Sequence, residues 1–122
     1  MVEVHPVDKA QAERFAERAG VTLPVRAMRM SRGEQELGYV LYRIDRDTME
    51  LVALYSCEQP LEELLVRAAL NDAVNELAIH AVCRNTAHFA LLERLGFLRE
   101  ENAYTIFIPD FFMRPCSGCH GS

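Results

Sequence analysis

The pattern of hydrophobic and polar positions in the first twenty residues predicts a strand followed by a helix. Residues 2–7 are expected to form a short first strand. Asp8 then has the character of a helix N-cap, with Gln11 three residues later in the capping-box position. Apolar side chains recur at helical spacing, and Gly20 supplies the stop. The apolar positions of this helix are Ala12, Phe15, Ala16 and Ala19.

Three strands joined by tight turns are predicted next. Residues 25–30 and 37–44 are expected to pair across a turn-rich connection at residues 31–34. A second turn at residues 45–48 leads into a strand over residues 49–55. The second half of that strand is apolar without alternation, which is typical of a strand buried on both faces.

A long helix is predicted from Pro60, a residue favoured at the first helical position. One polar stripe recurs every four residues, at Glu63, Arg67, Asn71 and Asn75. The remaining face is wide and apolar, so this helix is expected to pack broadly across a sheet. The apolar positions include Leu61, Leu64, Leu65, Ala68, Leu70, Val74 and Leu77.

The last third of the chain adds two strands around a short helix. A strand over residues 78–84 is followed by a helix that Gly96 stops, with Phe97 packing back over its last turn. A final strand over residues 104–108 ends at Pro109. A strand–helix–strand crossover implies a parallel pair at the centre of a mixed sheet. We therefore predict an α+β fold over residues 1–110, with a mostly antiparallel twisted sheet and flanking helices, followed by a tail at residues 111–122.

Composition narrows the class of protein further. The chain of 122 residues is 50% hydrophobic, enough for one ordinary core. Its formal net charge is -5, with acidic and basic residues interleaved, which argues against nucleic acid as a partner. We expect neither a secretory signal nor a membrane-spanning segment, and hence a cytoplasmic protein whose cysteines stay reduced.

The helix before Gly96 carries a family resemblance. Its sequence resembles the last helix of the GNAT superfamily of acyl-CoA-dependent N-acyltransferases, whose commonest motif there is N-x-x-A-x-x-L-Y-E-K-L-G-F. The corresponding segment here is Asn85-Thr86-Ala87-His88-Phe89-Ala90-Leu91-Leu92-Glu93-Arg94-Leu95-Gly96-Phe97. The resemblance extends over roughly residues 25–108 and implies a GNAT-type sheet that splays after Tyr55. It also implies transfer of an acyl group from acetyl-CoA to a small-molecule or peptide amine. A homodimer is a further possibility that the resemblance raises.

The resemblance also implies where coenzyme A would bind. The family holds the pantetheine arm by backbone bonds to the fourth strand, here Leu54 and Tyr55. Its phosphate loop corresponds to residues 56–63, and the implied cofactor positions there are Cys57, Leu61 and Glu62. Asn85 matches the family's asparagine, although helix capping also explains an asparagine at that place. The loop has no glycine, loses an N–H at Pro60 and carries three carboxylates, so we expect the diphosphate to be poorly held.

The family's usual general acid, a tyrosine, is replaced by Leu92. Another proton donor is needed, and the predicted topology brings Tyr55, Cys57, Cys83 and His88 near the cleft. Of these we select three catalytic candidates: Tyr55, Cys83 and His88. A free cysteine there is more often a small core residue than a nucleophile, and a histidine at that place is more typical of a surface or groove position on the last helix.

The tail contains the other conspicuous motif, C-x-x-C-H, formed by Cys116, Cys119 and His120. That pattern attaches c-type haem in the appropriate context, which is missing here. Two thiolates and an imidazole also supply three zinc ligands, with Cys83, Cys57 or His88 as a fourth. A metal-free tail is the plain alternative. Besides an N-acyltransferase, the sequence thus allows a non-catalytic GNAT-fold binding module or a metal- or redox-sensing protein.

Overall fold

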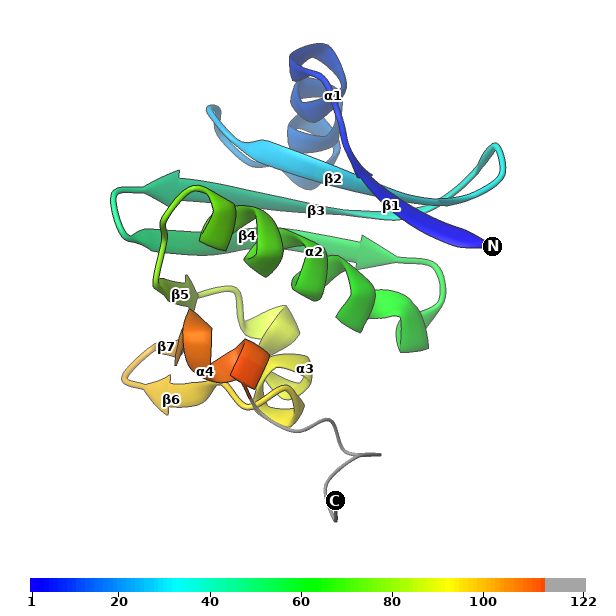
Figure 1. The fold of residues 1–122 in the computed structure, drawn as a ribbon. Helices are drawn as coiled ribbons and strands as arrows, with labels where there is room; N and C mark the ends of the chain where they lie inside the picture. The colour runs from blue at the N-terminus through cyan, green and yellow to red at the C-terminus, as the bar shows by residue number, and fades with distance from the viewer. Residues whose placement is uncertain (114–122) are drawn as a thin grey trace.

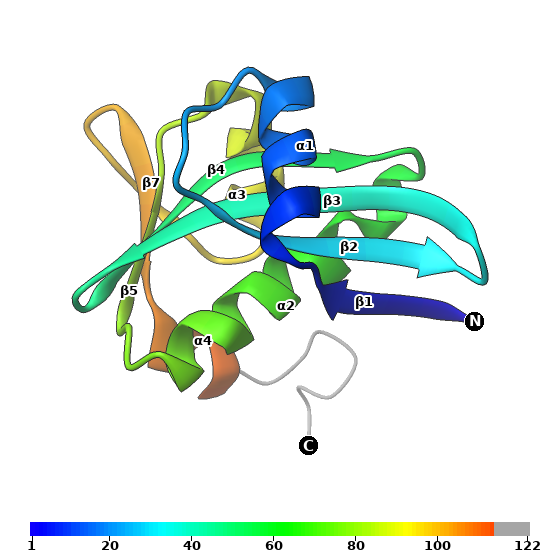
Figure 2. The same cartoon turned by 90° about the horizontal axis from the view of Figure 1, so that it is seen from above.

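The computed structural model describes residues 1–113, which form a mixed sheet with helices on both faces (Figures 1 and 2). The strand order across the seven-stranded sheet of these residues is β1-β2-β3-β4-β5-β7-β6. Only β4 and β5 run parallel within it. The predicted α+β class and its central parallel pair are confirmed. The strands are β1 (Val2–Pro6), β2 (Arg26–Arg32), β3 (Gln35–Asp45), β4 (Thr48–Ser56), β5 (His80–Cys83), β6 (Leu98–Glu100) and β7 (Ala103–Phe107).

The helices begin and end largely where local chemistry predicts. Helix α1 (Lys9–Ala19) starts at Asp8, whose Oδ1 accepts the Gln11 N–H at 2.8 Å. It ends at Gly20, where φ is 70°. Helix α2 (Glu62–Asn75) follows the 3-10 turn η1 (Gln59–Leu61), which contains the proline that we expected at the helix start. The remaining helical segments are η2 (Thr86–His88), α3 (Phe89–Arg94) and α4 (Ile108–Met113).

The two faces of the sheet are covered by different helices. On β3, Tyr39 and Leu41 pack with α1, whereas Val40 and Tyr42 belong to the larger core that includes α2. Successive strand side chains point to opposite faces, so α1 and α2 lie on opposite sides of the sheet, as Figure 2 shows from above. Helix α2 runs across β2, β3 and β4 on its side.

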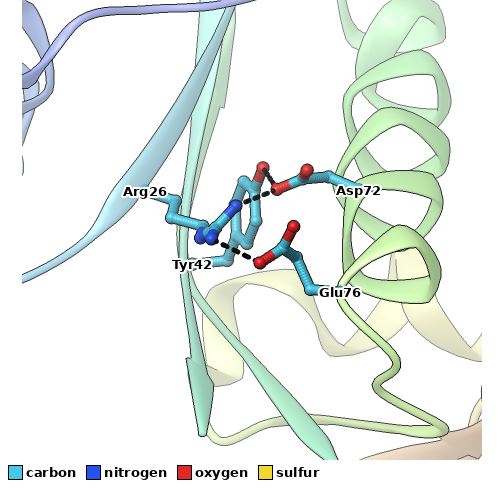
Figure 3. A network of polar contacts seen from close by, with 4 residues as sticks. All are labelled: Arg26, Tyr42, Asp72 and Glu76. Atoms are coloured by element: carbon cyan, nitrogen blue, oxygen red, sulfur yellow. Dashed lines mark hydrogen bonds and ion pairs between the residues drawn. The ribbon is translucent and has the colours of Figure 1, made fainter.

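A polar network fastens the C-terminal end of α2 to the sheet (Figure 3). The Tyr42 hydroxyl donates to Asp72 Oδ2 at 2.6 Å, and Arg26 Nη1 donates to the same oxygen at 3.0 Å. Arg26 Nη2 donates to Glu76 Oε1 at 2.9 Å. Burial and the neighbouring Asp72 carboxylate both raise the pKa of Tyr42. The hydroxyl therefore stays protonated and acts as a donor.

The expected apolar face of α2 is wrong in part. Leu64 and Val74 are exposed, and Leu77, beyond the helix end, is 82% exposed. The buried stripe is narrower because it follows the strict helical spacing that faces the sheet. It consists of Leu65, Val66, Ala69, Leu70 and Ala73.

Two elements near the C-terminal end were not anticipated. Strand β6 forms a hairpin with β7, and α4 continues directly from β7. The predicted end of the last strand near Pro109 is nearly right, but Pro109 lies in the first turn of a helix, a position that proline tolerates. Phe111, which we assigned to the tail, is buried in the main core beside Arg67 of α2.

Candidate functional site

The central feature of the site is a fork between the parallel strands β4 and β5. Their pairing runs from Thr48 opposite His80 to Leu51 opposite Cys83, and β4 then continues to Ser56 paired with β3 but not with β5. The strands therefore separate after Leu51, four residues earlier than the predicted splay after Tyr55.

A β-bulge accounts for the position of the fork. On β3, Leu41 lies opposite Ala53 but its neighbour Tyr42 lies opposite Leu51, which leaves Val52 as an extra residue on β4. A bulge bends its strand and increases its local twist. Because this one follows the last residue paired with β5, it turns the end of β4 away from β5.

The separated part of β4 presents a partly open apolar wall. Val52, Ala53 and Leu54 are only half-buried, and Tyr55 is 50% exposed. The expected burial on both faces is therefore wrong beyond Leu51, because no neighbouring strand covers this edge. An unpaired strand edge offers backbone N–H and C=O groups to a ligand.

Asn85 holds the branch point of the fork together. Its Nδ2 donates to the Val52 carbonyl oxygen at 3.2 Å, and its Oδ1 accepts the Ala87 N–H at 3.0 Å. The side chain thus caps η2, as the plain interpretation of the sequence expects. It also ties the bulge of β4 to the residue that follows β5 by two positions, a role that the sequence does not reveal.

The loop at the start of α2 uses most of its own backbone donors. The N–H groups of Cys57 and Leu61 donate to the carbonyl oxygens of Leu37 and Glu58 at 2.9 and 3.0 Å. The Glu58 N–H donates to Ser56 Oγ at 3.2 Å, and the Glu62 N–H donates to the Gln59 carbonyl. An anion site at a helix N-terminus needs such groups free to point at the ligand.

Charge at the same loop is mostly negative. Glu62 and Glu63 stand in the first turn of α2, where carboxylates interact well with the helix dipole. Glu58 Oε2 lies 3.2 Å from Arg32 Nη1, which partly balances its charge. Glu63 likewise pairs with Arg67 at 3.0 Å. The loop is therefore internally satisfied and offers a diphosphate little attraction.

Strands β3 and β4 approach each other closely beside the fork. Gly38 of β3 lies opposite Ser56, and a Cβ added at Gly38 would stand 2.9 Å from Ser56 Cα and closer still to the Tyr55 carbonyl oxygen. Only a glycine permits this approach. It fixes the backbone of β4 just where β4 has lost β5 as a neighbour.

The predicted catalytic residues have different environments. Cys83 is fully buried (0% exposed), and its Sγ lies 3.8 Å from the Asn85 carbonyl oxygen. Burial raises the pKa of the Cys83 thiol, so this side chain is protonated at neutral pH and lies in the core. Leu92, at the place of the family's tyrosine, is 1% exposed and belongs to the core.

Two of the candidates can reach solvent. His88 is half-buried at the junction of η2 and α3, and burial lowers its pKa, so the imidazole is neutral at pH 7. Tyr55 lies at the end of β4 beside the fork, with its ring 5.8 Å from that of Tyr39. Of these two, Tyr55 is the one whose position on the fork the strand register fixes.

The predicted metal ligands Cys116, Cys119 and His120 lie outside the described residues. Within residues 1–113, no group of three His, Cys, Asp or Glu side chains is placed to hold a metal ion. None of the helices in that range is long and apolar enough to cross a membrane.

The fold and its fork define a GNAT-type acyltransferase fold. No family model and no curated protein matches the sequence. Solved structures do match: a predicted GNAT-family acetyltransferase of Chromobacterium violaceum has a TM-score of 0.69 at 14% identity, over 91% of this chain and 90% of that one. A predicted GNAT-family acetyltransferase of Desulfovibrio desulfuricans has a TM-score of 0.68 at 13% identity, over 88% and 99%.

A third similar structure is a complex with coenzyme A. It is the PaiA N-acetyltransferase of Thermoplasma acidophilum in complex with coenzyme A, with a TM-score of 0.63 at 12% identity, over 86% of this chain and 96% of that one. The similarity of these structures shows that this chain has the GNAT fold; at identities of 12–14% it shows the fold alone.

Proposed function

We propose that this protein transfers an acyl group from acetyl-CoA to a small-molecule or peptide amine. The observation that carries the proposal is the fork, where β4 leaves β5 after Leu51 and exposes a half-buried apolar edge. Ligands of open α/β sheets bind beyond the carboxyl ends of such strands. The structural likeness to a coenzyme A complex supports the same assignment.

The two parts of coenzyme A fit this chain unequally. The pantetheine arm is an extended chain with amide groups, which suits the open edge of β4 at Leu54 and Tyr55. The diphosphate would meet Glu58 and Glu62 beside donors that are already used. Each carboxylate at ~4 Å from a phosphate repels it by about 1 kcal/mol or more, depending on the local dielectric. The arm rather than the diphosphate therefore provides most of the binding.

The bound thioester would supply the acyl group, and the protein has to position the reactants and handle protons. Direct attack by an amine needs no protein nucleophile, which agrees with a buried, protonated Cys83. Positioning and backbone donors that polarise a carbonyl supply much of such catalysis. We assign the Tyr55 hydroxyl as the proton donor, because it is exposed at the fork while Leu92 is buried.

Calorimetric titration with acetyl-CoA at two salt concentrations tests the binding mode. We expect weak binding that depends little on salt, because few of the contacts involve the diphosphate. Glu58→Gln with Glu62→Gln should tighten binding by removing repulsion. Micromolar affinity that is lost as salt rises would instead mean that residues 57–63 hold the diphosphate.

Activity is tested separately by following coenzyme A release with a panel of amines. Tyr55→Phe should lower kcat while leaving acetyl-CoA affinity nearly unchanged, since the backbone contacts remain. The internally satisfied loop at α2 also favours a second candidate, a non-catalytic binding module of the same fold. Acetyl-CoA binding without acylation of any amine or release of coenzyme A would support that second candidate.

A further inference from the structure

A row of polar and aromatic side chains crosses the α1 face of the sheet and ends at the fork. Arg29 of β2 lies directly opposite Tyr39 of β3, and Tyr39 lies directly opposite Tyr55 of β4. Neighbouring strands are about 4.8 Å apart, so Arg29 is only about 10 Å across the sheet from Tyr55. Because β4 has no strand on its β5 side beyond Leu51, Tyr55 is the end of this row and borders the opening.

Helix α1 places a second arginine above the same row. Phe15 stacks on Tyr39 with ring centroids 4.7 Å apart and planes 11° apart. The Arg18 guanidinium carbon stands 4.9 Å from the Phe15 ring centroid and 5.6 Å from that of Tyr39. A guanidinium held against aromatic rings is oriented in advance, so little freedom is lost when it binds a ligand.

The charges of Arg18, Arg29 and Glu36 do not balance. Glu36 is shared by two arginines: its Oε2 accepts from Arg18 Nη1 at 3.0 Å, and its Oε1 lies 3.6 Å from Arg29 Nε. Two guanidinium groups facing one carboxylate leave one positive charge in excess. Arg29 Nε is buried and has no hydrogen-bond acceptor among residues 1–113. Within the same residues, Nη1 is the one nitrogen through which Arg18 forms a hydrogen bond.

We infer that the acceptor of the proposed acyl transfer is an amine that also carries a carboxylate, recognised by Arg18 with support from Arg29. This inference rests on the proposed function. The acyl donor would lie along the end of β4 that leads into η1 and α2. The α1 face of the sheet therefore remains for the acceptor amine. An acceptor lying against the Tyr55 ring would have its carboxylate directed at the excess positive charge and its amine at the opening.

The transfer step then balances without a further reactant. The neutral amine nitrogen attacks the thioester carbonyl carbon, a C–N bond forms and the C–S bond breaks. The nitrogen releases one proton to solvent, the departing sulfur takes up one proton from Tyr55, and Tyr55 regains a proton from solvent. The carboxylate of the acceptor is unchanged, so Arg18 acts in positioning and specificity.

The test compares amines that differ only in the carboxylate. Phenylalanine against 2-phenylethylamine and lysine against 1,5-diaminopentane are two such pairs. A charge-assisted hydrogen bond corresponds to a preference of about 10- to 100-fold in kcat/KM for the carboxylate member of each pair. Arg18→Gln should remove most of this preference, and Arg18→Lys should retain part of it.

Arg14→Gln is the matched control, because Arg14 is exposed one helical turn earlier and forms no interaction within residues 1–113. It should keep the full preference. Equal kcat/KM for both members of each pair, or an equal loss for both in Arg18→Gln, would overturn the inference while leaving acyl transfer intact.

A binding measurement separates this inference from the proposed function. Saturation-transfer NMR should detect phenylalanine on the protein without acetyl-CoA, with a signal several-fold weaker in Arg18→Gln than in Arg14→Gln. If no amine is acylated but this difference is seen, the acyl-transfer proposal fails and the carboxylate site stands. Absence of the difference counts against the site whatever the activity.

Discussion

Replacement of Tyr42 by phenylalanine isolates one hydrogen bond that joins α2 to the sheet. Tyr42 is 1% exposed, and its hydroxyl donates to Asp72 Oδ2 at 2.6 Å. Tyr42→Phe removes the donor and leaves the ring in place. Asp72 keeps its ion pair with Arg26 at 3.0 Å and is partly exposed, so the carboxylate is not stranded.

The expected loss follows from these contacts. Hydrogen bonds to charged groups contribute about 1.5–3 kcal/mol, and the remaining partner of Asp72 places Tyr42→Phe near the lower end, at about 1.5 kcal/mol. A domain of this size should then melt about 5 °C lower. Asp72→Ala should cost more, about 2 kcal/mol, because it leaves the buried Tyr42 hydroxyl without its acceptor. In a double-mutant cycle, the two changes should therefore couple by about 1 kcal/mol or more.

The raised pKa of the Tyr42 hydroxyl predicts that the stability of the protein falls at alkaline pH. In the folded state the pKa of Tyr42 is raised by burial and by Asp72, whereas an unfolded tyrosine ionises near pH 10. Stability from this group is therefore complete below pH 10 and is lost as the pH rises above it. By pH 11 the wild type should lose about 1.4 kcal/mol that Tyr42→Phe does not lose.

Urea unfolding followed by circular dichroism from pH 8 to pH 11 measures both effects. The difference between wild type and Tyr42→Phe cancels the contributions of other groups, including Tyr104. A difference under about 0.5 kcal/mol at pH 8, with parallel curves up to pH 11, would refute the reasoning. It would show that the hydroxyl exchanges its partner for water at no cost.

Three further predictions concern the fork and the tail. Asn85→Ala should lower the free energy of unfolding by about 1–2 kcal/mol through loss of the cap and of the bond to Val52; Asn85→Asp keeps the cap alone, so acetyl-CoA titration with both variants shows whether the bond to Val52 supports binding. Gly38→Ala should cost about 1–3 kcal/mol because backbone atoms block its Cβ; Gly33→Ala, where φ is 61° and space is open, is the control and should cost less in thermal melts. Zinc measured in protein purified without chelator should be lost in a Cys116→Ser, Cys119→Ser variant, and equally negligible zinc in both would dismiss the predicted tail site.

Local chemistry explains why much of the fold could be predicted from the sequence. Asp8 and Gly20 bound α1, and the Phe97 N–H donates to the Leu92 carbonyl at 3.0 Å just beyond the stop at Gly96. These signals depend on neighbouring residues alone. The parallel pairing of β4 with β5 follows from the crossover through α2, which leaves little choice of topology.

The candidate site was harder to predict from the sequence, because it depends on contacts between distant segments. The bulge at Val52 is set by how β4 aligns with β3, and no residue type marks it. The same alignment brings Tyr55 beside Tyr39. Arg18 reaches Tyr39 only because α1 folds back over β3, 21 residues further along the chain. Hydrophobic periodicity describes single elements and is silent on such alignments.

The fork has a cost that a ligand can offset. Beyond Leu51, β4 has no strand on its β5 side, and its half-buried apolar side chains include Val52 and Leu54. Unpaired backbone groups and uncovered apolar surface both weaken a sheet. A longer β5 would have covered this edge; instead the bulge bends β4 at Val52, and the bond from Asn85 to Val52 fixes the point at which the strands separate.

The features that open the sheet and the features that hold a diphosphate are therefore separable in this chain. The bulge, the Asn85 bond and the close approach at Gly38 all stabilise the fork, whereas the loop at residues 57–62 has already used most of its donors. A ligand that occupies the fork as an extended arm would restore backbone hydrogen bonds along β4 and cover its apolar wall. Such a ligand needs no anion site at α2, so the acidic loop would weaken binding of acetyl-CoA without removing the geometry on which the proposed acyl transfer depends.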